Sequence, residues 1–119
     1  MPEPVPTEAV VVAVPVTAER QVDHSWGRAP RVALVSVADG RVVGWTEHAV
    51  GWDVLHDEGA EGSHHARVVR FLRENGVGAV AASHMGAPMV RTIGKLGLRL
   101  LLDAHGDAEA AALTVAAQA

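Results

Sequence analysis

The chain has 119 residues, of which 49% are hydrophobic and 3% aromatic, and its formal net charge is −4 with neutral histidines. This length indicates one domain with a buried core, and the acidic balance argues against nucleic-acid binding, which needs a basic surface. The absence of cysteine excludes disulfides and any zinc or iron–sulfur site built on protein thiolates.

The N-terminal region shows no targeting or membrane-spanning signal. Residues 1–8 contain three prolines and few apolar side chains, so we predict a flexible tail followed by a single domain over 9–119. The segment lacks the basic stretch of a signal peptide, and no apolar run reaches the roughly 20 residues that span a bilayer. We therefore expect a cytoplasmic protein without membrane contact.

Three strands are predicted in the first half of the chain. Residues 9–16 form a continuous apolar run rich in β-branched side chains, which is typical of a strand buried on both faces. Residues 31–38 and 41–48 alternate in polarity on either side of Asp39-Gly40. Asp-Gly favours the type I′ turn, in which both central residues have positive φ, so these two strands should form a hairpin.

A helix is predicted after the glycine-rich loop 49–62. Ser63 is a suitable N-cap, and apolar residues recur at helical spacing as far as the Asn75-Gly76 pair, which is typical of a helix end. Then follow a strand, a loop, a helix with Pro88 at its first position and Gly97 after its end, another strand, and a helix capped by Asp107. In chain order these segments cover 77–83, 84–87, 88–96, 98–103 and 108–118.

This order of elements predicts a mixed α/β sheet with one edge suited to ligand binding. Two successive reversals make the third strand parallel to the first. Right-handed helical crossovers make the fourth and fifth strands parallel to it as well. The carboxyl ends of these four strands then share one edge, which is where open α/β sheets bind ligands.

All seven histidines fall in segments that belong to this edge. They are His24, His48, His56, His64, His65, His84 and His105. Because histidine is the commonest metal ligand, whereas a hard cation would need a site dominated by Asp and Glu, the pattern favours copper, zinc or iron. A helix N-terminus also favours neutral imidazole and binds anions, so a larger anionic metal–sulfur species is the alternative to a single ion.

Three segments together carry a family resemblance. They are "VAVPVT" (12–17), "VDHSWGRAPRVALVSVADGRVV" (22–43) and "EGAEGSHHARVVRFLRENGVGAVAASHMG" (58–86). Over about residues 10–105 the chain resembles the dinitrogenase iron–molybdenum cofactor biosynthesis proteins, which include NifX- and NafY-like accessory and carrier proteins. The resemblance implies a ribonuclease H-like fold with helices on both faces of a mixed five-stranded sheet of order 3-2-1-4-5, in which the second strand is antiparallel.

The resemblance also implies a function and a site. Members carry or help to assemble sulfur clusters of molybdenum, iron or copper, so a cluster donor or acceptor protein is the expected partner. Because cysteine is absent, the cluster would be held by histidine, Met85 and backbone N–H groups. The expected metal ligands are His24, His64, His65 and His84, and the expected further contacts are Trp26, Ser63, Met85 and Gly86.

Catalytic functions fit the sequence poorly. Ribonuclease H chemistry needs metal-binding carboxylates, typically with one on the first strand, and residues 9–16 have none. No Gly-x-Ser-x-Gly motif marks a hydrolase. The main alternative to a metal or cluster carrier is a non-enzymatic domain for protein interaction or small-anion binding, in which His64 and His65 are solvated residues at the helix start.

Overall fold

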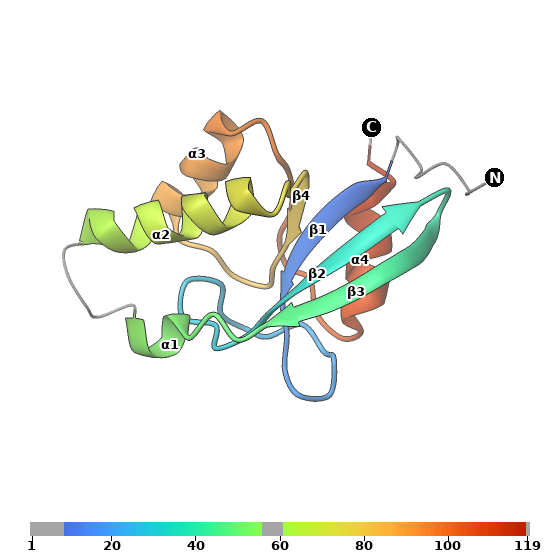
Figure 1. The fold of residues 1–119 in the computed structure, drawn as a ribbon, viewed down its shortest axis with the longest axis horizontal. Helices are drawn as coiled ribbons and strands as arrows, with labels where there is room; N and C mark the ends of the chain where they lie inside the picture. Colours follow the sequence, from blue (N-terminus) through green and yellow to red (C-terminus); the bar gives the residue numbers. More distant parts are fainter. Residues whose placement is uncertain (1–8, 56–60, 119) are drawn as a thin grey trace.

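The computed structural model describes residues 9–55 and 61–118, which form a five-stranded sheet flanked by helices (Figure 1). The strands are β1 (Val10–Pro15), β2 (Val32–Ala38), β3 (Arg41–His48), β4 (Ala79–Ala81) and β5 (Arg99–Leu101). The sheet order is β3-β2-β1-β4-β5, which confirms the predicted order. The predicted tail at residues 1–8 lies outside the described residues.

Strand directions also agree with the prediction. The central strand β1 pairs antiparallel with β2 and parallel with β4, and β5 is parallel to β4. β2 and β3 form the expected hairpin, and at their turn Asp39 and Gly40 have φ values of 54° and 74°. Both values are positive, as a type I′ turn requires. The carboxyl ends of β1, β3, β4 and β5 therefore share one edge of the sheet, which we call the loop edge.

Helices cover both faces of the sheet. They are α1 (Trp52–Leu55), α2 (Glu61–Glu74), α3 (Ala87–Lys95) and α4 (Ala108–Ala116). One core contains side chains of α2 and α3 packed on Ala13 and Val80, and the other contains α4 packed on Val12 and Val14. Alternate residues of β1 thus enter different cores, as the pleat of a strand dictates. Figure 1 shows α4 behind β1–β3, with α2 and α3 grouped away from it.

The predicted start of α2 was wrong. Ser63 is the third residue of the helix, not its N-cap. The buried stripe of the helix is made by His64, Val68 and Leu72, which are four residues apart and at most 4% exposed. The helix begins at Glu61, and the contact of His64 with the Gly27 carbonyl holds this first turn against the loop after β1. Residues 49–62 also contain the short helix α1, which was predicted as loop.

Most other element ends follow their local signals. Gly76 and Gly97 lie just beyond α2 and α3 with φ values of 62° and 75°, the left-handed conformation that glycine adopts easily. The Asp107 side chain accepts a hydrogen bond from the Ala110 N–H and caps α4, as predicted. Pro88 is the second residue of α3, one position later than predicted, because Gly86 is the N-cap. No helix in the described part of the chain is long and apolar enough to cross a bilayer.

Candidate functional site at the loop edge

The loop edge receives most of the histidines, as the strand directions require. His24 follows β1, His48 ends β3, His84 follows β4 and His105 follows β5. His56 lies outside the described residues. Strand direction and loop order therefore place these side chains at one end of the sheet. They do not decide whether the imidazoles lie close enough together to bind one metal ion.

The imidazole of His64 points into the protein. It is 4% exposed, its Nε2 lies 2.7 Å from the Gly27 carbonyl oxygen, and its Nδ1 lies 2.8 Å from Nη1 of Arg67. A carbonyl only accepts hydrogen bonds and a guanidinium only donates them. His64 is therefore a neutral imidazole that carries its proton on Nε2. Its ring fastens α2 to the loop after β1 and is not directed at solvent.

Aromatic rings pack around this contact. Trp26 and Trp52 meet edge to face with ring centroids 5.4 Å apart, and Trp52 makes similar contacts with Phe71 at 5.6 Å and with His64 at 6.2 Å. His48 packs on the other side of Phe71 at 5.4 Å. The loop after β1, the helix α1 and the helix α2 are thus joined by one aromatic cluster. Such edge-to-face pairs stabilise a structure beyond their buried area.

Trp26 was predicted to contact a bound cluster, and it lies in the core next to the loop edge. It is 1% exposed, and its indole Nε1 has no hydrogen-bond partner among the described residues. A buried N–H without a partner costs free energy and is uncommon. The indole N–H of Trp26 is therefore a hydrogen-bond donor in the loop after β1 that the described residues leave unpaired.

The other predicted ligands are more accessible but are not gathered into a metal centre. The His24 side chain is 95% exposed, with Nδ1 3.3 Å from Asp23, and His84 is also exposed, whereas His65 is half-buried. Within residues 9–55 and 61–118, no group of three or more His, Cys, Asp or Glu side chains could hold a metal ion. The loop edge therefore offers separate imidazoles and no preformed multidentate site.

The remaining predicted contacts lie in the turn after β4 and at the start of α2. Met85 is 7% exposed and belongs to the core shared by α2 and α3. Gly86 is exposed at the N-terminus of α3, and Ser63 is exposed in the first turn of α2. Of these three residues, Gly86 and Ser63 are accessible from solvent, whereas Met85 packs in the core beneath the turn.

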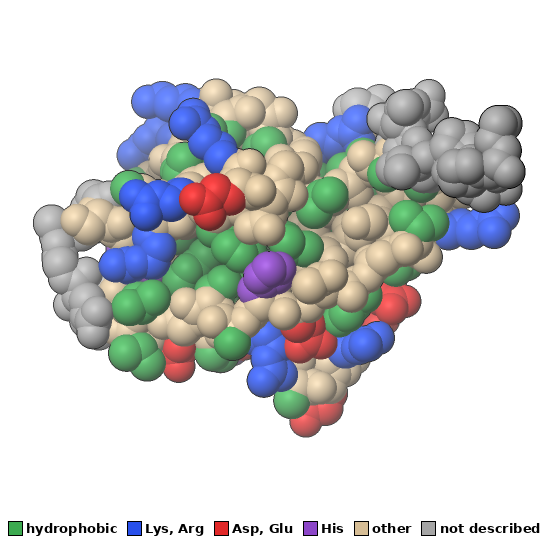
Figure 2. All heavy atoms as spheres, in the orientation of Figure 1, with side chains coloured by type: hydrophobic (Ala, Val, Ile, Leu, Met, Phe, Trp, Pro, Cys, Tyr) green, Lys and Arg blue, Asp and Glu red, His purple; other side chains and the backbone are tan. Residues whose placement is uncertain are grey.

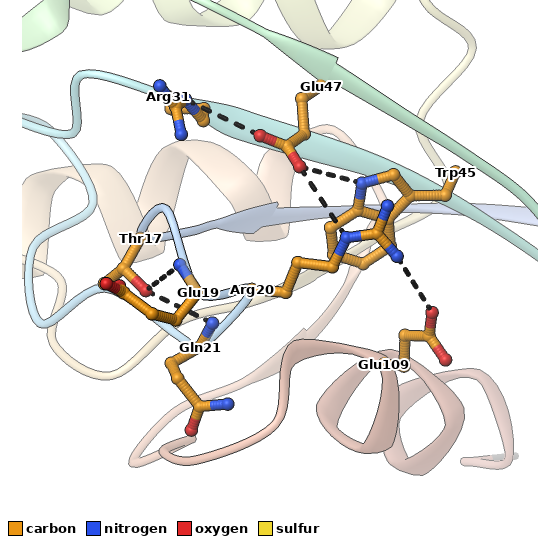
Figure 3. A network of polar contacts seen from close by, with 8 residues as sticks. All are labelled: Thr17, Glu19, Arg20, Gln21, Arg31, Trp45, Glu47 and Glu109. Carbon is orange, nitrogen blue, oxygen red and sulfur yellow. Dashed lines mark hydrogen bonds and ion pairs between the residues drawn. The ribbon is translucent and has the colours of Figure 1, made fainter.

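A polar network that the sequence did not reveal holds the base of the loop after β1 (Figure 3). Arg20 has a φ of 60° and lies over the Trp45 ring, with Cζ 4.6 Å from the ring centroid. Its guanidinium is 4.0 Å from Glu47 and 3.8 Å from Glu109. Glu47 also accepts a hydrogen bond from Trp45 Nε1 at 3.0 Å and lies 3.5 Å from Arg31. The network joins this loop to β3 and α4, so both ends of the loop that carries His24 are fixed.

These features define the class of protein: a small α/β domain in which the loops at one end of a mixed five-stranded sheet form the candidate binding region. The family model for dinitrogenase iron-molybdenum cofactor proteins matches residues 8–118. The chain therefore belongs to the dinitrogenase iron–molybdenum cofactor family. The resemblance inferred from the sequence is confirmed.

Solved structures share the fold at low sequence identity. The apo form of the orange protein from Desulfovibrio gigas is 16% identical, with a TM-score of 0.69 over 86% of this chain and 82% of that one. PH0822 is 16% identical, with a TM-score of 0.68 over 88% and 87%. A putative NifB protein from Thermotoga is 20% identical, with a TM-score of 0.58 over 87% and 84%. A comparison with curated protein sequences gives no significant match.

Proposed function

We propose that the protein is a non-catalytic accessory protein that binds a metal–sulfur cluster of the iron–molybdenum type at the loop edge and delivers it to an acceptor protein. The observation that carries the proposal is the family match, which extends over residues 8–118. The orange protein and the putative NifB protein, which share the fold, support it. The ribonuclease H-like description of the fold belongs to the same proposal and rests on the strand order.

A cluster fits the loop edge better than a single ion does. A mononuclear copper or zinc site needs three or four side-chain ligands, and the described residues bring no such group together. A cluster is larger and anionic, so it can be held by widely spaced imidazoles and by N–H donors. The unpartnered indole N–H of Trp26 is a candidate donor of this kind.

We assign the leading ligand roles to His24 and His84. They lie on the loops after β1 and β4, which are neighbouring parallel strands, and both rings are exposed. His65 is the third candidate, with Ser63 and Gly86 as backbone contacts at the starts of α2 and α3. His64 would have to break its contacts with Gly27 and Arg67 to bind metal, so we assign it the role of holding the loop that carries His24.

The test is metal analysis of the untagged full chain. Anaerobic incubation with iron, molybdate and sulfide, followed by gel filtration, should leave metal and a visible absorption band on the protein. A double variant, His24→Ala with His84→Ala, should retain about tenfold less metal because two ligands are lost. His105→Ala, which removes an exposed imidazole of the same edge, is the matched control.

Three results would count against the proposal. If the wild-type chain retains no metal after gel filtration, it does not carry a cluster under these conditions and the alternative of a protein-interaction or small-anion domain is favoured. If the double variant and His105→Ala retain as much metal as the wild type, the ligands lie elsewhere. Retention of one metal ion without a visible band would indicate a mononuclear site.

A further inference from the structure

The outer side of α2 and α3 carries a basic surface on an acidic protein. Five of the ten Lys and Arg residues lie between positions 67 and 95, together with only one of the 14 acidic residues, Glu74. The five basic residues are Arg67, Arg70, Arg73, Arg91 and Lys95. Because the whole chain has a net charge of −4, the rest of it is strongly acidic. Figure 2 shows the blue side chains gathered over these two helices.

Most of these cations have no side-chain partner among the residues that the structure describes. In the part of the chain that the structure describes, Arg70, Arg73 and Arg91 form neither ion pairs nor side-chain hydrogen bonds, and the same is true of Lys95. By contrast, Arg20 forms ion pairs with two glutamates and Arg31 with one. A group of unpaired cations creates a local positive potential that attracts and orients acidic partners.

An open apolar groove lies along the basic surface. Its volume is about 380 Å³, and it runs between the end of β3, α1 and α2. We call it the α2 groove; it is lined by His48, Ala49, Val50, Trp52, Leu55, Arg67, Arg70, Phe71 and Glu74. In Figure 2 a hollow with apolar atoms is bordered by cationic side chains, by an acidic side chain and by a histidine. The groove is open to solvent along its length, which suits a polypeptide better than an enclosed small molecule.

The floor of the groove is preorganised. Trp52 and Phe71 are fixed by their edge-to-face contact, and Arg67 donates a hydrogen bond to the Leu55 carbonyl across the gap between α2 and α1. Val54 on α1 is a further apolar side chain beside this region and is 65% exposed. Rigid aromatic groups next to arginines are the typical composition of an interface centre.

We propose that the α2 groove binds an acidic segment of a partner protein, with an apolar side chain of that segment in the groove and its carboxylates against Arg70 and Arg73. The proposal does not depend on cluster binding. A protein segment fits better than a nucleic acid, because a phosphate backbone has no apolar side chain for the groove. A partner docked here would lie beside His48 and therefore next to the loop edge.

The test uses the full chain without cluster and a short fluorescein-labelled peptide of glutamates and aspartates around a leucine pair. Fluorescence anisotropy at low salt should show binding, and added salt should weaken it. Arg70→Glu with Arg73→Glu should weaken the affinity about tenfold. Arg41→Glu with Arg99→Glu makes the same change in net charge at the starts of β3 and β5, away from the groove, and should change the affinity less than about twofold.

Two further measurements locate the site and identify its occupant. On titration with the peptide, NMR spectra should show shifts in the Trp52 indole N–H and in the amides of His48 and Phe71. The Trp45 indole should not shift. A peptide with serines in place of the leucine pair should bind about fivefold more weakly, since it cannot fill the apolar floor.

The proposal is overturned if both double variants weaken binding equally, because the effect would then be one of net charge. It also fails if a single-stranded RNA binds through the same residues more tightly than the peptide. A concentration-dependent rise in mass that Arg70→Glu with Arg73→Glu abolishes would assign the groove to a second copy of the chain. Absence of peptide binding at low salt would overturn it outright.

Discussion

The side chain of His64 shows how far a residue's role can depend on distant contacts. The sequence places His64 at a helix start on the loop edge, where a metal ligand is a reasonable prediction. Its structural role comes from Gly27, which is 37 residues away in the chain, and from Arg67. Nothing in the local pattern indicates that the first turn of α2 faces inward. The strand order identified the edge, but the burial of each imidazole depends on tertiary packing.

Replacing His64 with phenylalanine tests this structural role. The change keeps an aromatic ring beside Trp52 but leaves the Gly27 carbonyl and the Arg67 guanidinium without their partner. Lost hydrogen bonds at a buried site cost about 1–3 kcal/mol, so the free energy of unfolding should fall by that amount. Urea denaturation followed by circular dichroism measures it. The exposed His84→Phe is the control, and equal stability of the two variants would contradict the role assigned to His64.

At the scale of elements, local signals were reliable and tertiary ones were missed. The Asp39-Gly40 turn, the glycines after α2 and α3, and the Asp107 cap were predicted because each acts within a few residues. α1 was missed because it has only four residues and is fixed by the burial of Trp52, which the sequence alone does not reveal. The start of α2 was misplaced for a similar reason, since the contact of His64 in its first turn with Gly27 is not visible in the sequence.

The cap of α4 gives a prediction for a single element. Asp107 accepts a hydrogen bond from the Ala110 N–H at 3.1 Å, which satisfies a donor that the first turn would otherwise leave unpaired. Asp107→Ala should therefore lower the free energy of unfolding by about 1 kcal/mol, measured by urea denaturation. Asp107→Asn retains an acceptor and should lose less than half of that. If both variants are as stable as the wild type, the cap does not contribute to the stability of α4.

At the scale of the molecule, one strand connects two cores. Ala13 of β1 lies in the core with α2 and α3, while Val12 and Val14 lie in the core with α4. The continuous apolar run 9–16 indicated a strand buried on both faces, which agrees with the helices found on both faces of the sheet. Because β1 is shared, neither core can lose its packing without removing the contacts that one face of the central strand makes.

The shared strand predicts that the two cores unfold together. Val68 of α2 and Val115 of α4 are both fully buried, one in each core, so either change to alanine should cost about 2 kcal/mol. In a Trp45→Phe background, tryptophan fluorescence reports Trp26 and Trp52 in the first core, whereas circular dichroism reports the whole chain. For each variant the urea midpoints from the two probes should coincide and shift together, as a two-state transition requires. If Val115→Ala shifts the circular dichroism midpoint but leaves the fluorescence midpoint in place, the cores unfold independently and β1 does not couple them.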